Sequence, residues 1–209
     1  MTEPKFDQEY WEDRWSQVLR DHAEQIALRP PNEWLIKEVA DLQPGLALDA
    51  GCGHGSDALW LAARGWRVTA VDFSAAALDH ARSTAETLGA EVAERIDWVQ
   101  GDLSTWSPPP AHFDLVLSLY VHMADSVEAA VRRLAGGLAL GGSLFMVGHR
   151  PIDPATGAET AAAGQLQVSV EAAKAALNPD SWTFRVAEDR LRSTSLSGVD
   201  AVVLARRQA

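Results

Sequence analysis

Short apolar runs alternate with longer amphipathic stretches over residues 34–147 of this chain. Five of the runs predict strands, at residues 46–49, 68–71, 96–100, 113–119 and 143–147. The segments between strands carry apolar residues at the three- and four-residue spacing of a helix. Alternating strands and helices are typical of a parallel sheet made of β-α-β units, so we expect an α/β fold with helices on both faces of the sheet.

Small polar residues and glycines mark the ends of the predicted helices. Ser56 and Asp57 are placed to cap a helix that Gly65 ends, and Ser74 is placed to cap the next one, which Gly89 ends. The pattern changes after the fifth strand. Two further strands, at residues 182–190 and 199–205, are joined by a connection too short for a crossover helix, so we expect them to pair antiparallel as a hairpin.

The chemistry starts where the first strand ends, in the segment Leu48-Asp49-Ala50-Gly51-Cys52-Gly53-His54-Gly55. Glycines let the backbone turn sharply and approach a ligand where a Cβ atom would collide. Asp72 ends the second strand, about 20 residues further on, at the position of a ribose-binding carboxylate. The two features together predict a site for a nucleotide cofactor.

The details of this loop favour one cofactor over another. A dinucleotide fingerprint requires the spacing Gly-x-Gly-x-x-Gly, whereas Gly55 arrives one residue early. Asp49 would repel a pyrophosphate, but it suits a ligand with an ammonium group and no phosphate. The methionine end of S-adenosylmethionine has these properties.

Residues 48–55, together with Val71-Asp72-Phe73-Ser74, resemble motifs I and II of the class I S-adenosylmethionine-dependent methyltransferases. The resemblance spans nearly the whole chain. It implies a Rossmann-like, seven-stranded, mostly parallel sheet of order 3-2-1-4-5-7-6 with an antiparallel C-terminal hairpin. One domain is expected over residues 1–209, with a helical lid at 1–29, a cofactor-binding core at 30–150 and an acceptor-side part at 151–209. Within that last part, we interpret residues 151–164 as a mobile connection.

The resemblance also implies which residues touch the cofactor. Asp102, in a Gly-Asp-Leu turn after the third strand, is expected to meet the adenine amino group; the alternative is a solvated turn aspartate. Cys52 is interpreted as a small filler of the loop and not as a nucleophile, and with His54 it makes no convincing metal site. The expected cofactor-binding residues are Trp15, Asp49, Gly51, Cys52, Gly53, Asp72, Phe73, Asp102, Leu103 and Ser118, and no metal is expected.

The N-terminal segment Phe6-Asp-Gln-Glu-Tyr-Trp-Glu-Asp-Arg-Trp15 resembles the opening helix of the thiopurine methyltransferase and tellurite-resistance branch. In that branch such a helix folds over the cofactor. The alternative is that its aromatic residues only pack the helix onto the core.

Three residues are candidates for acid-base chemistry on the acceptor side. Tyr120 and His122 follow the fourth strand and His149 ends the fifth, so the topology brings them to the same edge of the sheet. Histidine titrates near neutral pH and suits a general base, although either ring can instead bond to the loop backbone. Arg150 is placed to attract an anionic acceptor or to serve as an ordinary surface residue.

The composition and charge of the chain limit the kinds of partner it is expected to bind. The 209 residues carry a formal net charge of −11, which opposes binding to a nucleic-acid backbone. The sequence shows no charged leader and no apolar stretch long enough for a membrane span, and its single cysteine agrees with a reducing compartment. A cytoplasmic protein with no nucleic-acid or membrane partner is expected, and its oligomeric state is not predicted.

The main hypothesis is an S-adenosylmethionine-dependent methyltransferase that acts on a small-molecule acceptor and releases S-adenosylhomocysteine (SAH). Residues 118–122 read Ser-Leu-Tyr-Val-His and lack the Asn/Asp-Pro-Pro-aromatic motif of enzymes that methylate amide or exocyclic nitrogens. An oxygen or sulfur acceptor, or a small metalloid oxyanion, is therefore favoured over a base or a protein glutamine. Two alternatives stay open. One is an NAD-dependent oxidoreductase, and the other is a non-catalytic module that binds S-adenosylmethionine.

Overall fold

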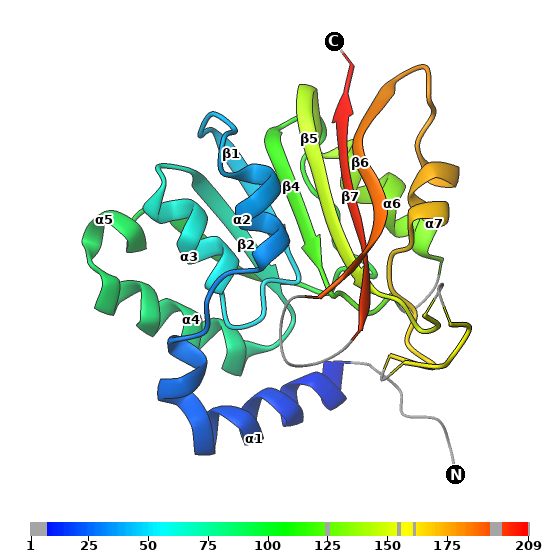
Figure 1. The fold of residues 1–209 in the computed structure, drawn as a ribbon. Coiled ribbons are helices and arrows are strands. Elements are labelled where there is room, and N and C mark those ends of the chain that lie inside the picture. The colour runs from blue at the N-terminus through cyan, green and yellow to red at the C-terminus, as the bar shows by residue number, and fades with distance from the viewer. Residues whose placement is uncertain (1–7, 124–125, 154–155, 161, 193–197, 209) are drawn as a thin grey trace. The chain divides into compact units, whose positions relative to one another are not determined.

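A computed structural model of the chain describes residues 8–123, 126–153, 156–160, 162–192 and 198–208 (Figure 1). Its strands follow the order β3-β2-β1-β4-β5-β7-β6, which is the predicted order. The chain divides into two compact units, residues 1–106 and residues 107–209.

The first unit is a three-stranded parallel sheet, β3-β2-β1, with helices around it. Its strands are β1 (Leu46–Ala50), β2 (Arg67–Asp72) and β3 (Ile96–Gln100), and its helices are α1 (Gln8–Ala27), α2 (Glu33–Val39), α3 (Ser56–Ala63), α4 (Ala75–Leu88) and α5 (Ala90–Ala93). Most of β1 and β2 is buried, as in parallel strands covered on both faces. Small residues such as Ala58, Ala62 and Ala81 let α3 and α4 lie close to this sheet.

The helix boundaries confirm one predicted cap and correct the other. The Ser74 hydroxyl accepts a hydrogen bond from the backbone N–H of Ala77 at 3.1 Å, and Gly89 ends α4, both as predicted. The predicted Ser56-Asp57 cap of α3 is wrong, because Gly55 is the N-cap of this helix. Asp57 accepts a hydrogen bond from the backbone N–H of Asn32 at 2.7 Å, so it joins α3 to the start of α2.

The second unit continues with a mixed sheet, β4-β5-β7-β6. Its strands are β4 (Phe113–Leu119), β5 (Leu138–His149), β6 (Trp182–Leu191) and β7 (Val199–Arg207), and its helices are α6 (Val127–Gly136) and α7 (Val170–Ala176). Strands β4 and β5 are parallel, whereas β7 pairs antiparallel with both β5 and β6, which confirms the predicted hairpin.

Strand β5 is longer than predicted, since it begins at Leu138 and not at residue 143. Its pairing with β4 shifts register between Phe113 and Leu115, so the glycine pair 141–142 lies at an irregularity inside the strand.

Some predicted features fall partly outside the described residues. Residues 6–7 of the N-terminal helix and residues 154–155 and 161 of the 151–164 connection are among them. Within the described part of that connection, Ile152 and Glu159 form an isolated antiparallel bridge. Among the helices that the structure describes, none is long and apolar enough to cross a membrane.

Candidate cofactor and acceptor sites

The glycine loop after β1 folds back onto the end of β2. The backbone N–H groups of Gly51 and Cys52 both donate to the carbonyl of Val71, at 2.8 and 3.0 Å. Gly53 has a φ of +52°, in the left-handed region, and its N–H donates to the Asp72 carboxylate at 2.8 Å. The loop therefore lies at the carboxyl ends of β1 and β2, where ligands bind in open α/β sheets.

The Asp72 carboxylate organises this loop. One oxygen accepts from Gly53 N–H and the other accepts from Ser74 N–H at 2.9 Å. Burial raises the pKa of Asp72, and these backbone donors oppose the rise. Each carboxylate oxygen has a second lone pair, so Asp72 retains acceptor capacity for ribose hydroxyls.

Asp49 presents a different case, a buried carboxylate with an unsatisfied oxygen. Its side chain lies on β1 and the residue is 2% exposed. Within the described part of the chain, its Oδ2 atom has no hydrogen-bond partner. Burial raises its pKa well above the ordinary value, and the nearby charges of Asp57 and Asp72 raise it further. Such a carboxylate is costly until a cationic or hydrogen-bonding ligand group pairs it, so this site fits the ammonium of S-adenosylmethionine.

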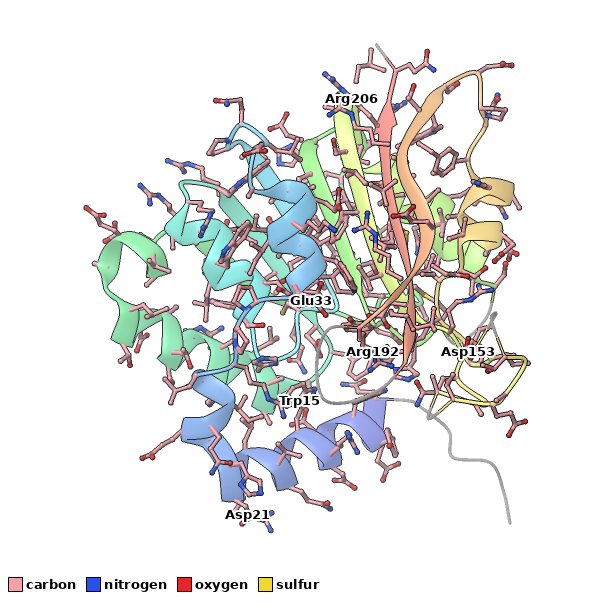
Figure 2. The ribbon with its side chains drawn as sticks, in the orientation of Figure 1. Trp15, Asp21, Glu33, Asp153, Arg192 and Arg206 are labelled. Carbon is pink, nitrogen blue, oxygen red and sulfur yellow. The ribbon has the colours of Figure 1, made fainter. Side chains whose placement is uncertain are left out.

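Helix α1 covers the glycine loop through Trp15, which points from the helix toward it (Figure 2). A Cβ atom on Gly53 would lie only 3.0 Å from Cζ2 of the Trp15 ring. The ring also lies 5.6 Å from that of His54, whose pKa falls to about 4 because of burial and, to a lesser degree, Arg29 and His80. Glu12 fixes the helix by accepting a hydrogen bond from Ala76 N–H, at the start of α4, at 3.2 Å.

The other predicted cofactor residues of the first unit lie in three environments. Asp102 is exposed and accepts from Ser104 N–H at 2.8 Å, which is a turn geometry that leaves the carboxylate accessible, and Leu103 beside it is half-buried. The carbonyl of Phe73 accepts from the side chain of Gln100 at 3.1 Å. Cys52 is buried, and burial raises the pKa of its thiol, followed by the charges of Asp49 and Asp72, so the thiol stays protonated.

In the second unit, Tyr120 and His149 stack at the carboxyl ends of β4 and β5. Their ring centroids are 4.0 Å apart. Tyr120 has a φ of +58°, a costly conformation for a tyrosine, and its backbone N–H donates to Val147 at 2.8 Å. Strained residues that their surroundings hold in place cluster at functional sites, so the strain at Tyr120 marks it as a candidate functional residue.

A buried aspartate, which the sequence reasoning missed, joins these two rings. Asp200 is fully buried on β7, directly opposite His149 in the antiparallel register. It accepts from the Tyr120 hydroxyl at 2.8 Å, and its other oxygen lies 2.9 Å from Nδ1 of His149 and 3.2 Å from Nε of Arg192. Figure 2 labels Arg192, which follows the end of β6. The available signal was an acid inside the apolar run Val199-Asp-Ala-Val-Val.

Gln167 connects the two predicted histidines. Its side-chain oxygen accepts from His149 backbone N–H at 2.8 Å, which fixes the orientation of the amide. The amide nitrogen then faces Nε2 of His122 at 3.3 Å and the side-chain oxygen of Gln165 at 3.1 Å. Because an amide nitrogen only donates, Nε2 of His122 accepts in this arrangement.

A cavity of about 550 Å³ opens beside His149, within the size range of small-molecule sites. Most of its surface is apolar, and Val127, Ile152, Leu166 and Val168 are among the residues that line it. Arg150 also lines it, but its guanidinium already pairs with Glu171 at 2.9 Å and lies 3.4 Å from Asp189.

Ser118, the remaining predicted cofactor residue, belongs to this unit. It lies near the end of β4 and is 1% exposed, and its hydroxyl has no hydrogen-bond partner within the described residues. The structure therefore groups the predicted residues into a loop cluster in the first unit and an acid-base cluster in the second.

Comparison with known proteins agrees with the fold and with the motifs. Residues 47–142 match the family described as methyltransferase domain. The trans-aconitate 2-methyltransferase of Paracidovorax citrulli is 34% identical over 134 residues, which make up 62% of this chain and 48% of that protein. The chain spans about half the length of the curated relatives it matches.

Solved structures share the fold at low sequence identity. The cyclase SpnF is 14% identical with a TM-score of 0.70, covering 95% of this chain and 96% of that one. The magnesium protoporphyrin IX methyltransferase of Synechocystis PCC 6803, solved with bound SAH, is 17% identical with a TM-score of 0.66, covering 96% and 99%.

The predicted branch is not singled out by these matches. TehB from Haemophilus influenzae is one of many structures with this fold, at 16% identity and a TM-score of 0.68, covering 85% of this chain and 62% of that one. The matches support a methyltransferase fold and no particular branch. Residues 47–142 match a methyltransferase-domain family, and the strands follow the order predicted for that fold. The chain thus shares the fold of solved methyltransferases.

Proposed function

We propose that this chain transfers a methyl group from S-adenosylmethionine to a small-molecule acceptor, at an oxygen or sulfur atom. The observation that carries the proposal is Oδ2 of Asp49, a buried carboxylate oxygen with no described partner beside a glycine loop. When bound, S-adenosylmethionine supplies a methyl group activated by its positively charged sulfur.

The residues of the first unit would bind and orient this cofactor. Asp49 pairs with its ammonium group, Asp72 accepts from the ribose hydroxyls, and Asp102 accepts from the adenine amino group. Trp15 covers the glycine loop and excludes water from it. Much of the acceleration in such a site comes from holding the two reactants in line.

Three observations support a small acceptor. The relative from Paracidovorax citrulli is named for methylating trans-aconitate, a small molecule. The cavity beside His149 has the volume of a small-molecule site, and the net charge of −11 opposes a nucleic-acid partner.

The position of helix α1 over the glycine loop supports the likeness to the thiopurine and tellurite-resistance branch. A cytoplasmic location remains a prediction.

The test is turnover. The purified chain is incubated with S-adenosylmethionine and a panel of thiols, phenols and carboxylic acids, and mass spectrometry measures SAH and the methylated product. The proposal expects both products to appear together with at least one acceptor and to disappear in Asp49→Asn. SAH binding without turnover across the panel would favour the non-catalytic module instead.

A further inference from the structure

We infer that the second unit holds a general-base site for a neutral acceptor, a weakly acidic hydroxyl or thiol on an apolar body, with His149 as the base and Asp200 as its positioning residue. This inference rests on the proposed methyl transfer. It narrows the acceptor to a class and assigns a role to a residue that the motifs do not include.

The bonds around His149 select one form of its ring. The Asp200 carboxylate is fully buried and lies 3.2 Å from Nε of the Arg192 guanidinium, whose positive charge favours a carboxylate that only accepts hydrogen bonds. Nδ1 of His149, 2.9 Å away, must then carry a proton. In the neutral ring this leaves the lone pair on Nε2, where a base needs it, in the way that the aspartate of a catalytic triad orients its histidine.

The surroundings hold this ring in place. Tyr120 stacks on it at 4.0 Å and donates to the other oxygen of Asp200, and Gln167 binds the His149 backbone. Among the described residues, no hydrogen bond engages Nε2 of His149. His122 is less suited to the role, since its own Nε2 faces the Gln167 amide nitrogen.

The charges around the cavity favour a neutral acceptor. Arg150 is the only lysine or arginine among the described residues that line it, and Glu171 and Asp189 already lie against its guanidinium. Glu128 adds an acid to the wall of the cavity, and the Arg192 guanidinium forms an ion pair with Asp200. A carboxylate acceptor would therefore meet no available cation there, and it would not need a base. Apolar side chains such as Val127, Leu166 and Val168 suit an apolar body.

The step balances in charge and atoms. The acceptor oxygen or sulfur forms a bond to the methyl carbon while the bond between that carbon and the donor sulfur breaks, and its electron pair stays on the sulfur. The acceptor proton passes to Nε2 of His149 and then to water. A positively charged donor and a neutral acceptor thus give a neutral thioether, a methylated product and one proton.

The kinetic test compares two substitutions with a matched control. His149→Ala should lower kcat with a phenol or thiol by about 100-fold or more, the range for losing a general base, with little change in SAH affinity. Asp200→Asn should also lower kcat, with little change in the KM for the acceptor, because the His149 ring is no longer held with its proton on Nδ1. Glu188→Gln removes an acid from β6 that pairs with Arg190, and should leave both kcat and KM unchanged.

A second measurement needs neither turnover nor a folded variant. Nitrogen-detected NMR of the histidine rings in the unmodified chain should show the neutral His149 ring with its proton on Nδ1. A neutral ring protonated on Nε2, or methylation confined to carboxylates with full turnover in His149→Ala, would overturn the inference. Because SAH binding is measured separately, loss of this base is distinguishable from failure of the proposed cofactor.

Discussion

Two buried aspartates of the first unit differ in the hydrogen-bond partners of their carboxylate oxygens. Asp72 already accepts two backbone hydrogen bonds, which fix the glycine loop, whereas Oδ2 of Asp49 has no partner within the described chain. The first carboxylate therefore shapes the site with or without a ligand. The second gains most when a cationic ligand arrives.

Asp72→Ala should weaken SAH binding by about 1–3 kcal/mol, since the ribose hydroxyls and two backbone donors lose their acceptor. Asp72→Asn keeps one acceptor oxygen and should lose less. Calorimetric titration of both variants checks the order. Equal SAH affinity in Asp72→Ala and the unmodified chain would contradict the ribose assignment.

SAH binding should weaken as the pH falls. The raised pKa of Asp49 keeps this carboxyl protonated in the free protein over a wider range, whereas the ligand ammonium favours the ionised form. Burial raises the pKa of the neighbouring Asp57 to about 6. A cationic ligand favours ionised Asp57 as well, so this carboxyl also makes binding weaker at low pH. Binding at low pH must therefore release a proton, and affinity should drop by up to about tenfold per pH unit for each proton released.

Titrations between pH 5 and 8 in buffers of different ionisation enthalpy measure that proton release. Asp49→Asn should bind more weakly at pH 8 and show a flatter pH dependence. An affinity that rises toward low pH in the unmodified chain would exclude this linkage.

Among the elements, β5 depends on a glycine just before its terminal histidine. A Cβ atom on Gly148 would collide with the backbone of Val168, which belongs to the segment that places Gln167 against His149. Gly148→Ala should therefore lower the free energy of unfolding by about 1–3 kcal/mol and reduce turnover.

The matched control is Gly136→Ala at the end of α6, where a Cβ atom meets nothing within 4 Å. Alanine is the better helix former, so this change should be neutral or stabilising by up to about 1 kcal/mol. Chemical denaturation measures both variants. If the two glycines respond alike, the close approach of Val168 is not what requires Gly148.

Elements were predictable when the signals for them lie within their own segment. Contacts between distant segments were not predictable. The strand β3 and the helix α4 were predictable because apolar spacing and flanking caps lie within each segment. The helix α7 was missed because its seven residues span only about two turns, too short for a helical spacing of apolar residues to stand out. The pairing of His149 with Asp200 was missed because it is set by the register between β5 and β7, 51 residues apart.

For the molecule as a whole, the strand order and the antiparallel C-terminal hairpin were predictable, and the structure confirms both. They followed from a motif resemblance together with connection lengths. The cofactor residues remain predictions, because a fold hosts many chemistries and function depends on the site. The acceptor lay beyond sequence reasoning, since its cavity is assembled from β5, the start of α6 and the 165–169 segment.

We expect the first unit to bind S-adenosylmethionine through its acidic glycine loop. Calorimetric titration of the purified chain with SAH, beside an identical titration with NADH, tests it most directly. Binding of SAH with no heat from NADH is the predicted result. Binding of NADH alone, or of neither ligand, would contradict this expectation.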